Sequence, residues 1–466
     1  MTGKPVAPSA GKKLSTREIV SYGLPRFGAA MMFLMVAVYL PKFYADTLLL
    51  APAFIAWTFL IGRFWDAFTD PVMGYVSDGT TSRMGRRRPY FLVSAVPVAI
   101  AYFFLWSPPD ALKDWGLFVY LTVTYLLTYT FWTVFSIPHN SLGAELTMDY
   151  HERTLLTGVR EGLGVLGTFV GTLAPPLFAF WLGSKQKGFS FLAAGTGIVT
   201  AVFIFVCFLN VRENPAFQKQ HPIAIREGLK ILFKNHPFRT LVVVYVCSLI
   251  GNAFVPILTL FMADYVVKMP KIAPYIIATY LLAIVPSILF WTRLSRRIGK
   301  KEAWSYALVL SSAVFAASMY YHEGTWLLWI ILAALAGFGY ACTLALAPSM
   351  MADVIDLDEL NTGRRREGAY FGVWSFIDKA AVGMTAFVGL QALDLMGYVP
   401  NQEQPPQVFW TMKVLYSVLP TICFGACYFL LRRYPISQDE HNRIRAEIES
   451  RKDSTDSDDC ERRVEW

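Results

Sequence analysis

The chain has 466 residues, of which 55% are hydrophobic and only 16% are charged. Soluble globular domains carry roughly 25% charged residues, so this composition excludes an ordinary soluble protein and indicates an integral membrane protein. The net charge of +8 fits basic loops at one membrane face better than a nucleic-acid-binding surface, and we expect no nucleic-acid partner.

Apolar runs long enough to cross a bilayer as helices recur along the chain. They form six spans, a longer polar stretch and six more spans, which predicts an all-α integral membrane protein with twelve transmembrane helices in two six-helix bundles. The first six are predicted at Ile19–Tyr44, Ala53–Val76, Tyr90–Trp106, Trp115–Ile137, Leu155–Leu182 and Phe189–Val211. The second six are predicted at Leu241–Val266, Ile272–Leu294, Ala303–Tyr321, Thr325–Met350, Gly368–Met396 and Val408–Leu431.

The distribution of basic residues predicts the orientation. Lysine and arginine concentrate in alternate loops, and short basic loops of this kind stay in the cytoplasm. We therefore expect a multi-pass protein of the cell inner membrane with both termini in the cytoplasm. The stretch before the first span lacks the apolar core of a cleaved signal peptide. The predicted divisions are a cytoplasmic segment 1–18, a bundle 19–211, a cytoplasmic loop 212–239, a bundle 240–432 and a cytoplasmic tail 433–466.

The second span carries Asp66 and Asp70 within otherwise apolar sequence. Residues at positions i and i+4 share one face of a helix. A carboxylate in hydrocarbon costs at least about 2.5–3.5 kcal/mol, so a pair of them requires compensation. The candidates are a bound cation, a proton, or a basic partner among Arg63, Arg160 and Lys379. Carboxylate oxygens suit a hard cation, and we favour ion-coupled transport over a purely internal ion pair.

The two halves of the sequence contain a similar loop. A basic loop with a glycine turn follows the second span at residues 83–88, and a similar loop follows the eighth at residues 293–301. This indicates two related bundles. In the fifth span, small residues at helical spacing predict a close packing face between the bundles: Gly162, Gly164, Gly167 and Gly171.

The second-span string resembles that of the glycoside–pentoside–hexuronide:cation symporters, a group within the major facilitator superfamily that includes the melibiose carrier. The resemblance runs from about Ser21 to Arg433. The residues that carry it are Trp65-Asp66-Ala67-x-x-Asp70-Pro71, Ile137-Pro138, Arg160, Met351-Ala352-Asp353-x-x-Asp356 and Lys379. It implies a major-facilitator fold and cation-coupled transport by alternating access.

The resemblance also implies a site for the coupling cation. In the family the paired aspartates bind that ion, which here assigns Asp66 and Asp70, with Thr69 and Thr133 as helpers. Many relatives have Asn where this chain has Thr69. A hydroxyl can still coordinate a hard cation, so the ion is Na⁺ or H⁺ and the choice stays open.

The expected substrate cavity is lined by residues from both halves: Arg160, Lys379, Ser136, Ala30, Trp132, Tyr129 and Trp374. Melibiose-type carriers have acidic residues where this chain has Ala30 and Ser136, which argues against a galactoside. The aromatic residues are candidates for sugar stacking, although packing is the more common role of such side chains. Arg160 and Lys379 are either substrate contacts or structural counter-ions.

A cytoplasmic gate is predicted from Arg153, Asp353 and Arg365, which would form ion pairs when the cavity opens outward. The alternative is a solvated charged loop, in which such pairs contribute little.

The sequence does not predict an enzyme. It contains no HExxH, no paired Cys and His, and no phosphate-binding glycine loop. We expect no cofactor other than a coupling cation. The expected partners are a small solute such as a sugar or glycoside, Na⁺ or H⁺, and the lipid bilayer, around a monomer. The alternatives are a sodium-coupled transporter of a lysolipid or other amphiphile, and a non-transporting membrane scaffold.

Overall fold

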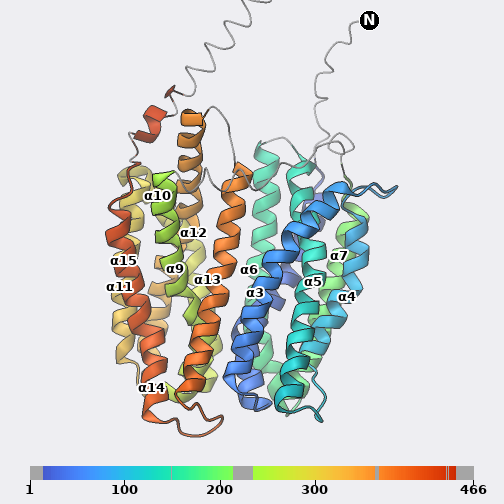
Figure 1. Cartoon of the computed structure of the whole chain (residues 1–466), viewed down its shortest axis with the longest axis vertical. Coiled ribbons are helices and arrows are strands. Elements are labelled where there is room, and N and C mark those ends of the chain that lie inside the picture. The colour runs from blue at the N-terminus through green and yellow to red at the C-terminus, as the bar shows by residue number, and fades with distance from the viewer. Residues whose placement is uncertain are drawn as a thin grey trace, which may run out of the picture. The chain divides into compact units, whose positions relative to one another are not determined.

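The computed structural model describes residues 14–147, 150–213, 235–362, 367–436, 438, 440–444 and 446–447. Within these ranges the chain consists of helices and turns without a strand (Figure 1). Most of the predicted central loop and the gate residue Arg365 lie outside the described residues. The side chain of Arg153 also lies outside them.

Every apolar run that was predicted as a span is helical. In the first half the elements are α1 (Thr16–Leu34), η1 (Met35–Tyr39), α2 (Leu40–Lys42), η2 (Phe43–Thr47), α3 (Pro52–Gly79), α4 (Pro89–Leu105), α5 (Asp114–Leu146), α6 (Tyr150–Trp181) and α7 (Lys185–Asn210). In the second half they are α9 (His236–Phe261), η4 (Met262–Val266), η5 (Pro270–Ile272), α10 (Ala273–Ile298), α11 (Lys300–Ala317), η6 (Ser318–Tyr320), α12 (Trp326–Thr362), α13 (Glu367–Leu395), α14 (Pro406–Lys413), η7 (Val414–Val418) and α15 (Leu419–Leu431).

By length and composition, 10 helices in the described part of the chain can cross a membrane. The other two predicted spans correspond to α3 and α4. Helix α4 is apolar but has only 17 residues. Helix α3 has 28 residues. Its apolar sequence is interrupted by three charged residues, Arg63, Asp66 and Asp70.

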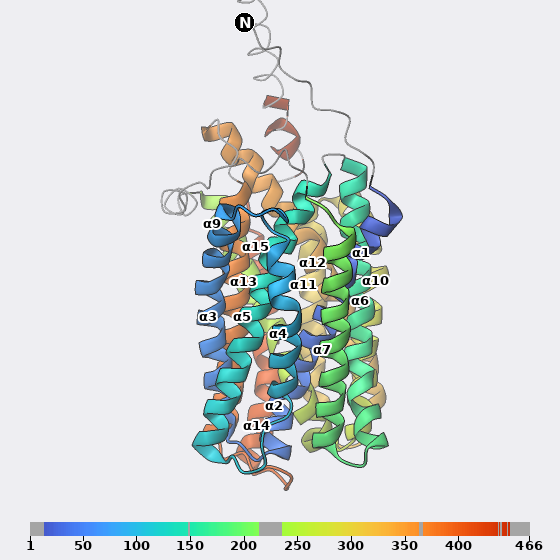
Figure 2. The same ribbon diagram turned by 90° about the vertical axis from the view of Figure 1, so that its right-hand side faces the viewer.

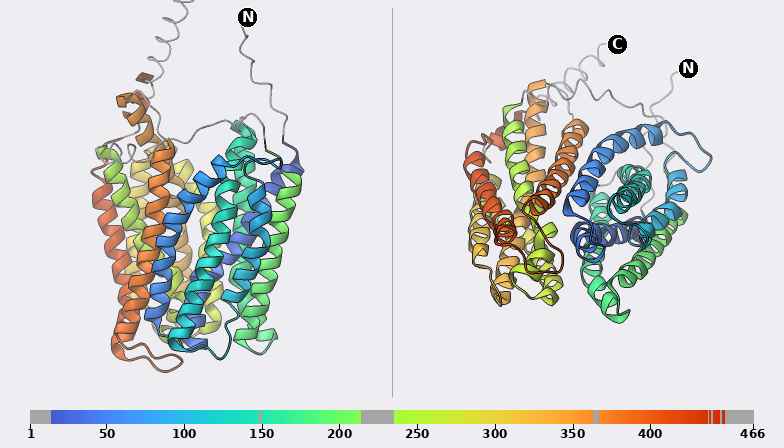
Figure 3. Two further views of the ribbon diagram at one scale, coloured as in Figure 1. Left: turned by 45° about the vertical axis from the view of Figure 1, so that its right-hand side comes forward. Right: turned by 60° about the horizontal axis from the view of Figure 1, so that its bottom comes forward.

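Contacts divide the chain into two units. One comprises Met1–Pro222 with Ala386–Glu403, and the other comprises Ile223–Thr385 with Gln404–Trp466. Within the first unit α1 packs against α6 and α7, and α4 packs against α5 and α7 (Figure 2). Helices α3 and α5 of this unit lie side by side (Figure 3). Within the second unit α10 packs on α12, and α9 packs on α15.

The glycine face of α6 packs on α1 of the same unit. A Cβ on Gly167 would lie 2.1 Å from the Phe27 carbonyl oxygen, and one on Gly171 would lie 2.9 Å from the Met31 carbonyl oxygen. The predicted close packing is therefore present, but its partner is α1 of the same unit and the prediction of a face between bundles is wrong. Small residues indicate a close approach without identifying the neighbouring helix.

Candidate functional site

The paired aspartates lie on α3 beside α5. Asp66 is buried, with 3% of its surface exposed. The Thr133 hydroxyl of α5 donates a hydrogen bond of 3.0 Å to Asp70 Oδ1. Gly62 lets the helices approach here, because a Cβ at that position would lie 2.3 Å from Cε1 of Tyr125. All four predicted cation-site residues therefore lie on two adjoining helices, with Asp66, Thr69 and Asp70 on α3 and Thr133 on α5.

The fourth residue of this set, Thr69, contributes a hydroxyl oxygen. Among the residues that the structure describes, Thr69 Oγ1 is buried and has no hydrogen-bond partner. Burying a hydroxyl without a hydrogen bond is unfavourable. The oxygen is therefore suited to a ligand that accepts its lone pair, and a cation held by Asp66 and Asp70 is such a ligand.

Arg63 is the basic residue whose contact with the pair is resolved. Its Nη1 atom lies 3.7 Å from Asp66 Oδ2 across one turn of α3. Its guanidinium carbon also lies 5.8 Å from the centre of the Tyr129 ring. Arg63 is therefore one basic partner of the Asp66 carboxylate.

Arg160 makes its ion pair elsewhere. Its Nη2 atom lies 2.8 Å from Glu161 Oε1, and its Nη1 atom donates to Asn140 Oδ1 at 3.0 Å. Arg26 of α1 also pairs with Glu161, at 3.3 Å. Sequence reasoning missed Glu161, although its position directly after Arg160 was a usable signal.

The predicted cavity residues of the first unit have different environments. Ala30, Trp132 and Ser136 are half-buried. Tyr129 is buried, and its ring stacks on Tyr125 with centroids 4.5 Å apart. These rings pack against each other, so Trp132, which is more accessible, is the better candidate for a stacking surface.

In the second unit the predicted Trp374 stacks on Tyr245 of α9. The ring centroids are 3.7 Å apart and the planes differ by 18°. The Tyr245 hydroxyl donates a hydrogen bond of 3.0 Å to Asp378 Oδ1. Lys379 is half-buried on the same helix as Trp374 and Asp378. The sequence alone did not indicate the role of Tyr245, because it lies far from α13 in the chain.

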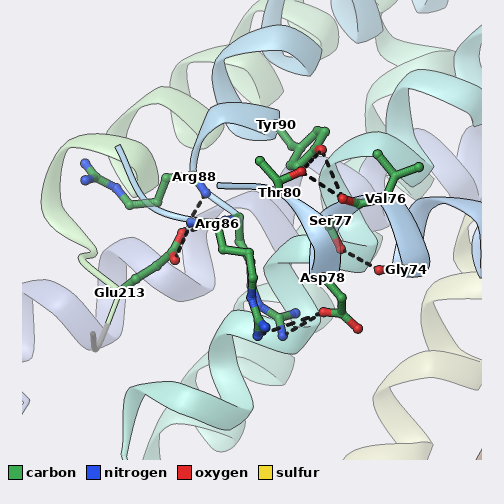
Figure 4. Close-up of polar contacts among 10 residues, drawn as sticks. Gly74, Val76, Ser77, Asp78, Thr80, Arg86, Arg88, Tyr90 and Glu213 are labelled. Carbon is green, nitrogen blue, oxygen red and sulfur yellow. Dashed lines mark hydrogen bonds and ion pairs between the residues drawn. The ribbon is translucent and has the colours of Figure 1, made fainter. Parts of the chain in front are cut away.

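The basic loop before α4 is fixed by Glu213, which lies just after α7 (Figure 4). Its carboxylate accepts backbone N–H bonds from Arg86 at 2.7 Å, Arg87 at 2.6 Å and Arg88 at 2.8 Å. The Arg87 guanidinium in turn lies 3.3 Å from Asp78 Oδ1. Burial lowers the pKa of Arg88, and Glu213 opposes this effect.

Asp353, predicted for the gate, lies in an ion-pair cluster within the second unit. Lys300 at the start of α11 contacts both of its carboxylate oxygens, at 2.6 and 2.7 Å. His441, from the segment after α15, lies 3.3 Å from Asp353 and 3.3 Å from Asp356. These residues account for the charge of Asp353 within the second unit. The predicted pairing with Arg153 and Arg365 falls outside the described side chains.

No group of three or more His, Cys, Asp or Glu side chains that could hold a metal ion occurs among the described residues. The cation-site candidate instead combines two carboxylates with two hydroxyls. That set is rich in hard oxygen ligands and suits a weakly held, exchangeable ion.

Comparison with known proteins agrees with these observations. Residues 21–438 match the family model described as MFS/sugar transport protein. The isoprimeverose transporter of Lactiplantibacillus pentosus is 28% identical over 91% of this chain and 89% of its own. A protein named provisionally as the glycoside/cation symporter YagG of Escherichia coli (strain K12) is 26% identical over 91% of this chain and 93% of its own.

A solved structure supports the fold. The nucleoside transporter NupG superposes with a TM-score of 0.64 at 12% identity, over 90% of this chain and 100% of that chain. The match to the family model covers most of the chain, and the relatives align along nearly their whole length. This chain is a multi-pass membrane protein that belongs to the MFS/sugar transport protein family, among the glycoside–pentoside–hexuronide:cation symporters of the major facilitator superfamily.

Proposed function

We propose that this protein is a cation-coupled symporter that moves a sugar, a glycoside or a related small solute by alternating access. The observation that carries the coupling is the juxtaposition of Asp66 and Asp70 with the Thr133 hydroxyl and the buried Thr69 hydroxyl. The names of the relatives support a saccharide-like solute.

The coupling has a simple electrostatic basis. Two carboxylates one helical turn apart repel each other by about 3 kcal/mol at an effective dielectric constant near 20. A cation between Asp66 and Asp70 removes this repulsion and draws α3 toward Thr133 of α5. The ordered helix pair then binds substrate more tightly, and the solute strengthens cation binding to the same extent.

We place the protein in the inner membrane as a monomer, with both termini in the cytoplasm. The basis for the orientation is the concentration of Lys and Arg in alternate loops. Arg160, Trp132 and Ser136 of the first unit and Lys379 of the second are the proposed contacts with the solute. The absence of carboxylates at Ala30 and Ser136 favours a solute other than a galactoside.

Uptake into proteoliposomes tests the function. Purified protein should accumulate a radiolabelled glycoside from a panel when a sodium or proton gradient is imposed, and not when potassium replaces the driving ion. Asp66→Asn and Asp70→Asn should each abolish ion-driven accumulation. Asp110→Asn is the matched control, because Asp110 is an exposed loop residue whose carboxylate accepts a hydrogen bond from Gln186 at the start of α7. Accumulation by both aspartate variants with unchanged ion dependence would refute the proposed coupling site.

A further inference from the structure

The basic loop between α10 and α11 borders a cavity of about 480 Å³ within the second unit. We propose that this cavity binds a phosphate-bearing anion, the headgroup of an anionic phospholipid, with free phosphate as the alternative source that the test separates. The proposal goes beyond the proposed function, because the cavity is lined by none of the residues assigned to the cation or to the solute.

The lining of the cavity is strongly charged. Its charged residues are Arg296, Arg297, Lys300, Lys301, Glu302 and Asp353. The Lys300 ammonium contacts both carboxylate oxygens of Asp353, at 2.6 and 2.7 Å, so these two charges balance each other. His441 also lines the cavity and lies 3.3 Å from Asp353. The Asp353 carboxylate is therefore already bound by cationic groups and does not repel a further anion at full strength.

The remaining charges of the lining are mostly positive. The Lys301 ammonium donates to two backbone carbonyl oxygens of the segment after α15, at 2.9 and 2.8 Å, and keeps its charge. Arg296 and Arg297 are exposed, and neither forms an ion pair among the described residues. Three cationic side chains thus stand against the single carboxylate of Glu302. Guanidinium groups suit the several oxygens of a phosphate.

The corresponding loop of the first unit shows how such a turn binds an anion. Gly85 and Gly299 both have positive φ, +107° and +90°. In the first unit the Glu213 carboxylate accepts the three backbone N–H groups that follow Gly85, at 2.6–2.8 Å (Figure 4). Successive backbone N–H groups at a turn form a concave anion-binding site. In the first unit this site is filled by a carboxylate of the chain itself.

The second unit has no such carboxylate among its described residues. Helix α11 begins directly after Gly299 without a side-chain cap. The N–H groups of residues 300–302 have no acceptor in the described part of the chain. The group nearest to a Cβ on Gly299 would be Gln438 Oε1, at 4.0 Å, and its amide is neutral. The first turn of α11 therefore borders the cavity with free N–H donors and the positive end of its helix dipole.

The place of the cavity favours a lipid as the source of the phosphate. The candidate span Pro270–Ile298 ends at this loop, so the cavity lies where a transmembrane helix leaves the bilayer. Basic pockets in this position bind anionic headgroups. Ile298 and Ile436 also line the cavity and offer apolar surface to the glycerol and upper chains. The volume is within the range of ligand pockets and exceeds the needs of a lone phosphate ion.

Binding is measured with purified full-length protein in octaethylene glycol dodecyl ether, a neutral detergent without a sugar headgroup. Thermal stabilisation is titrated with dihexanoyl phosphatidylglycerol, with dihexanoyl phosphatidylcholine and with inorganic phosphate. The two lipids have equal chains, and only the first has a net negative charge. It should bind about 10-fold or more tightly than either other probe. It should also slow hydrogen exchange at the amides of residues 300–302.

The double variant Arg296→Gln with Arg297→Gln should weaken phosphatidylglycerol binding about 10-fold. Both side chains are exposed, so the variant should fold. The matched control is Arg17→Gln with Arg239→Gln, which changes the net charge equally at two exposed positions outside the cavity. The control should bind as the wild type does.

Gln438→Glu provides an independent reading. It keeps every cation of the lining and places a carboxylate beside Gly299, as Glu213 is placed beside Gly85. This variant should also bind phosphatidylglycerol about 10-fold more weakly, because the new carboxylate competes for the same N–H groups. Exchange at residues 300–302 should be slow in it even without lipid.

Three results would overturn the proposal: equal binding of the two lipids, equal weakening by the two double variants, or unchanged affinity in both the cavity double variant and Gln438→Glu. Phosphate that binds as tightly as phosphatidylglycerol, with the same loss in the cavity double variant, would support the site and assign free phosphate as its occupant. Sodium-dependent stabilisation without lipid should be the same in all these variants, so failure of this proposal is distinguishable from failure of the cation site.

Discussion

Removing the Glu213 carboxylate should free the backbone of the basic loop before α4. Glu213 accepts three backbone N–H bonds, from Arg86, Arg87 and Arg88, at 2.6–2.8 Å. Hydrogen bonds to charged groups contribute about 1.5–3 kcal/mol each, and water can replace part of this. For Glu213→Ala we expect the free energy of local opening of this loop to fall by about 2–4 kcal/mol.

Hydrogen–deuterium exchange measures this opening directly. A loss of about 2–4 kcal/mol corresponds to roughly 30- to 800-fold faster exchange at the amides of residues 86–88, with little change in the centre of α5. Glu323→Ala is the matched control, since that carboxylate is 71% exposed and contacts only Lys268 among the ion pairs resolved in the described residues. Exchange at residues 86–88 that is the same in Glu213→Ala and the wild type would refute the reasoning.

Gly85 offers a second route to the same loop. Its φ is +107°, and a Cβ there would lie 2.6 Å from the Glu213 carboxylate. Gly85→Ala should therefore accelerate exchange at the same amides without removing any charge. A similar pattern in both variants would identify the Glu213 contact, and not the charge of the loop, as the stabilising element.

Further variants probe the other contacts. Thr133→Val removes a hydrogen-bond donor to Asp70 and should lower the sodium affinity, measured by thermal stabilisation, about 5- to 10-fold. Thr133→Ser keeps the donor and should leave this affinity unchanged. Asp46 is buried and contacts Lys42 and Tyr398, so Asp46→Asn should lower the thermal midpoint by about 2–4 °C. Gly167→Val should abolish the yield of folded protein, because the added Cβ would lie 2.1 Å from a carbonyl oxygen of α1. Gly162→Ala should express normally, because a Cβ at that position would have no neighbouring atom within 4 Å among the described residues.

The helices were predictable because hydrophobic length is a local property of the sequence. Each predicted apolar run coincides with helical structure, and even α3, with charges at Asp66 and Asp70, was identified because its flanking sequence is strongly apolar. The pairing of Thr133 with Asp70 was indicated by the family resemblance, which assigns both residues to one site. The match of residues 21–438 to the family model confirms that resemblance.

Partners distant in sequence could not be predicted in the same way. Glu213 lies 127 residues from Arg86, and Tyr245 lies 133 residues from Asp378. Only the fold brings these groups together, and neither composition nor helical period encodes the pairing. The glycine face of α6 shows the same limit, because small residues permit a close approach by any helix and the sequence could not identify α1.

The groups around an intramembrane carboxylate indicate its role. Asp66 and Asp70 share one face of α3, and the hydroxyls of Thr133 and Thr69 add oxygen ligands, a set that suits the proposed cation. Asp378 is a single carboxylate that receives a phenol hydrogen bond, and the aromatic pair fixes its direction. On this reasoning the first unit carries the proposed ion site, on α3 and α5.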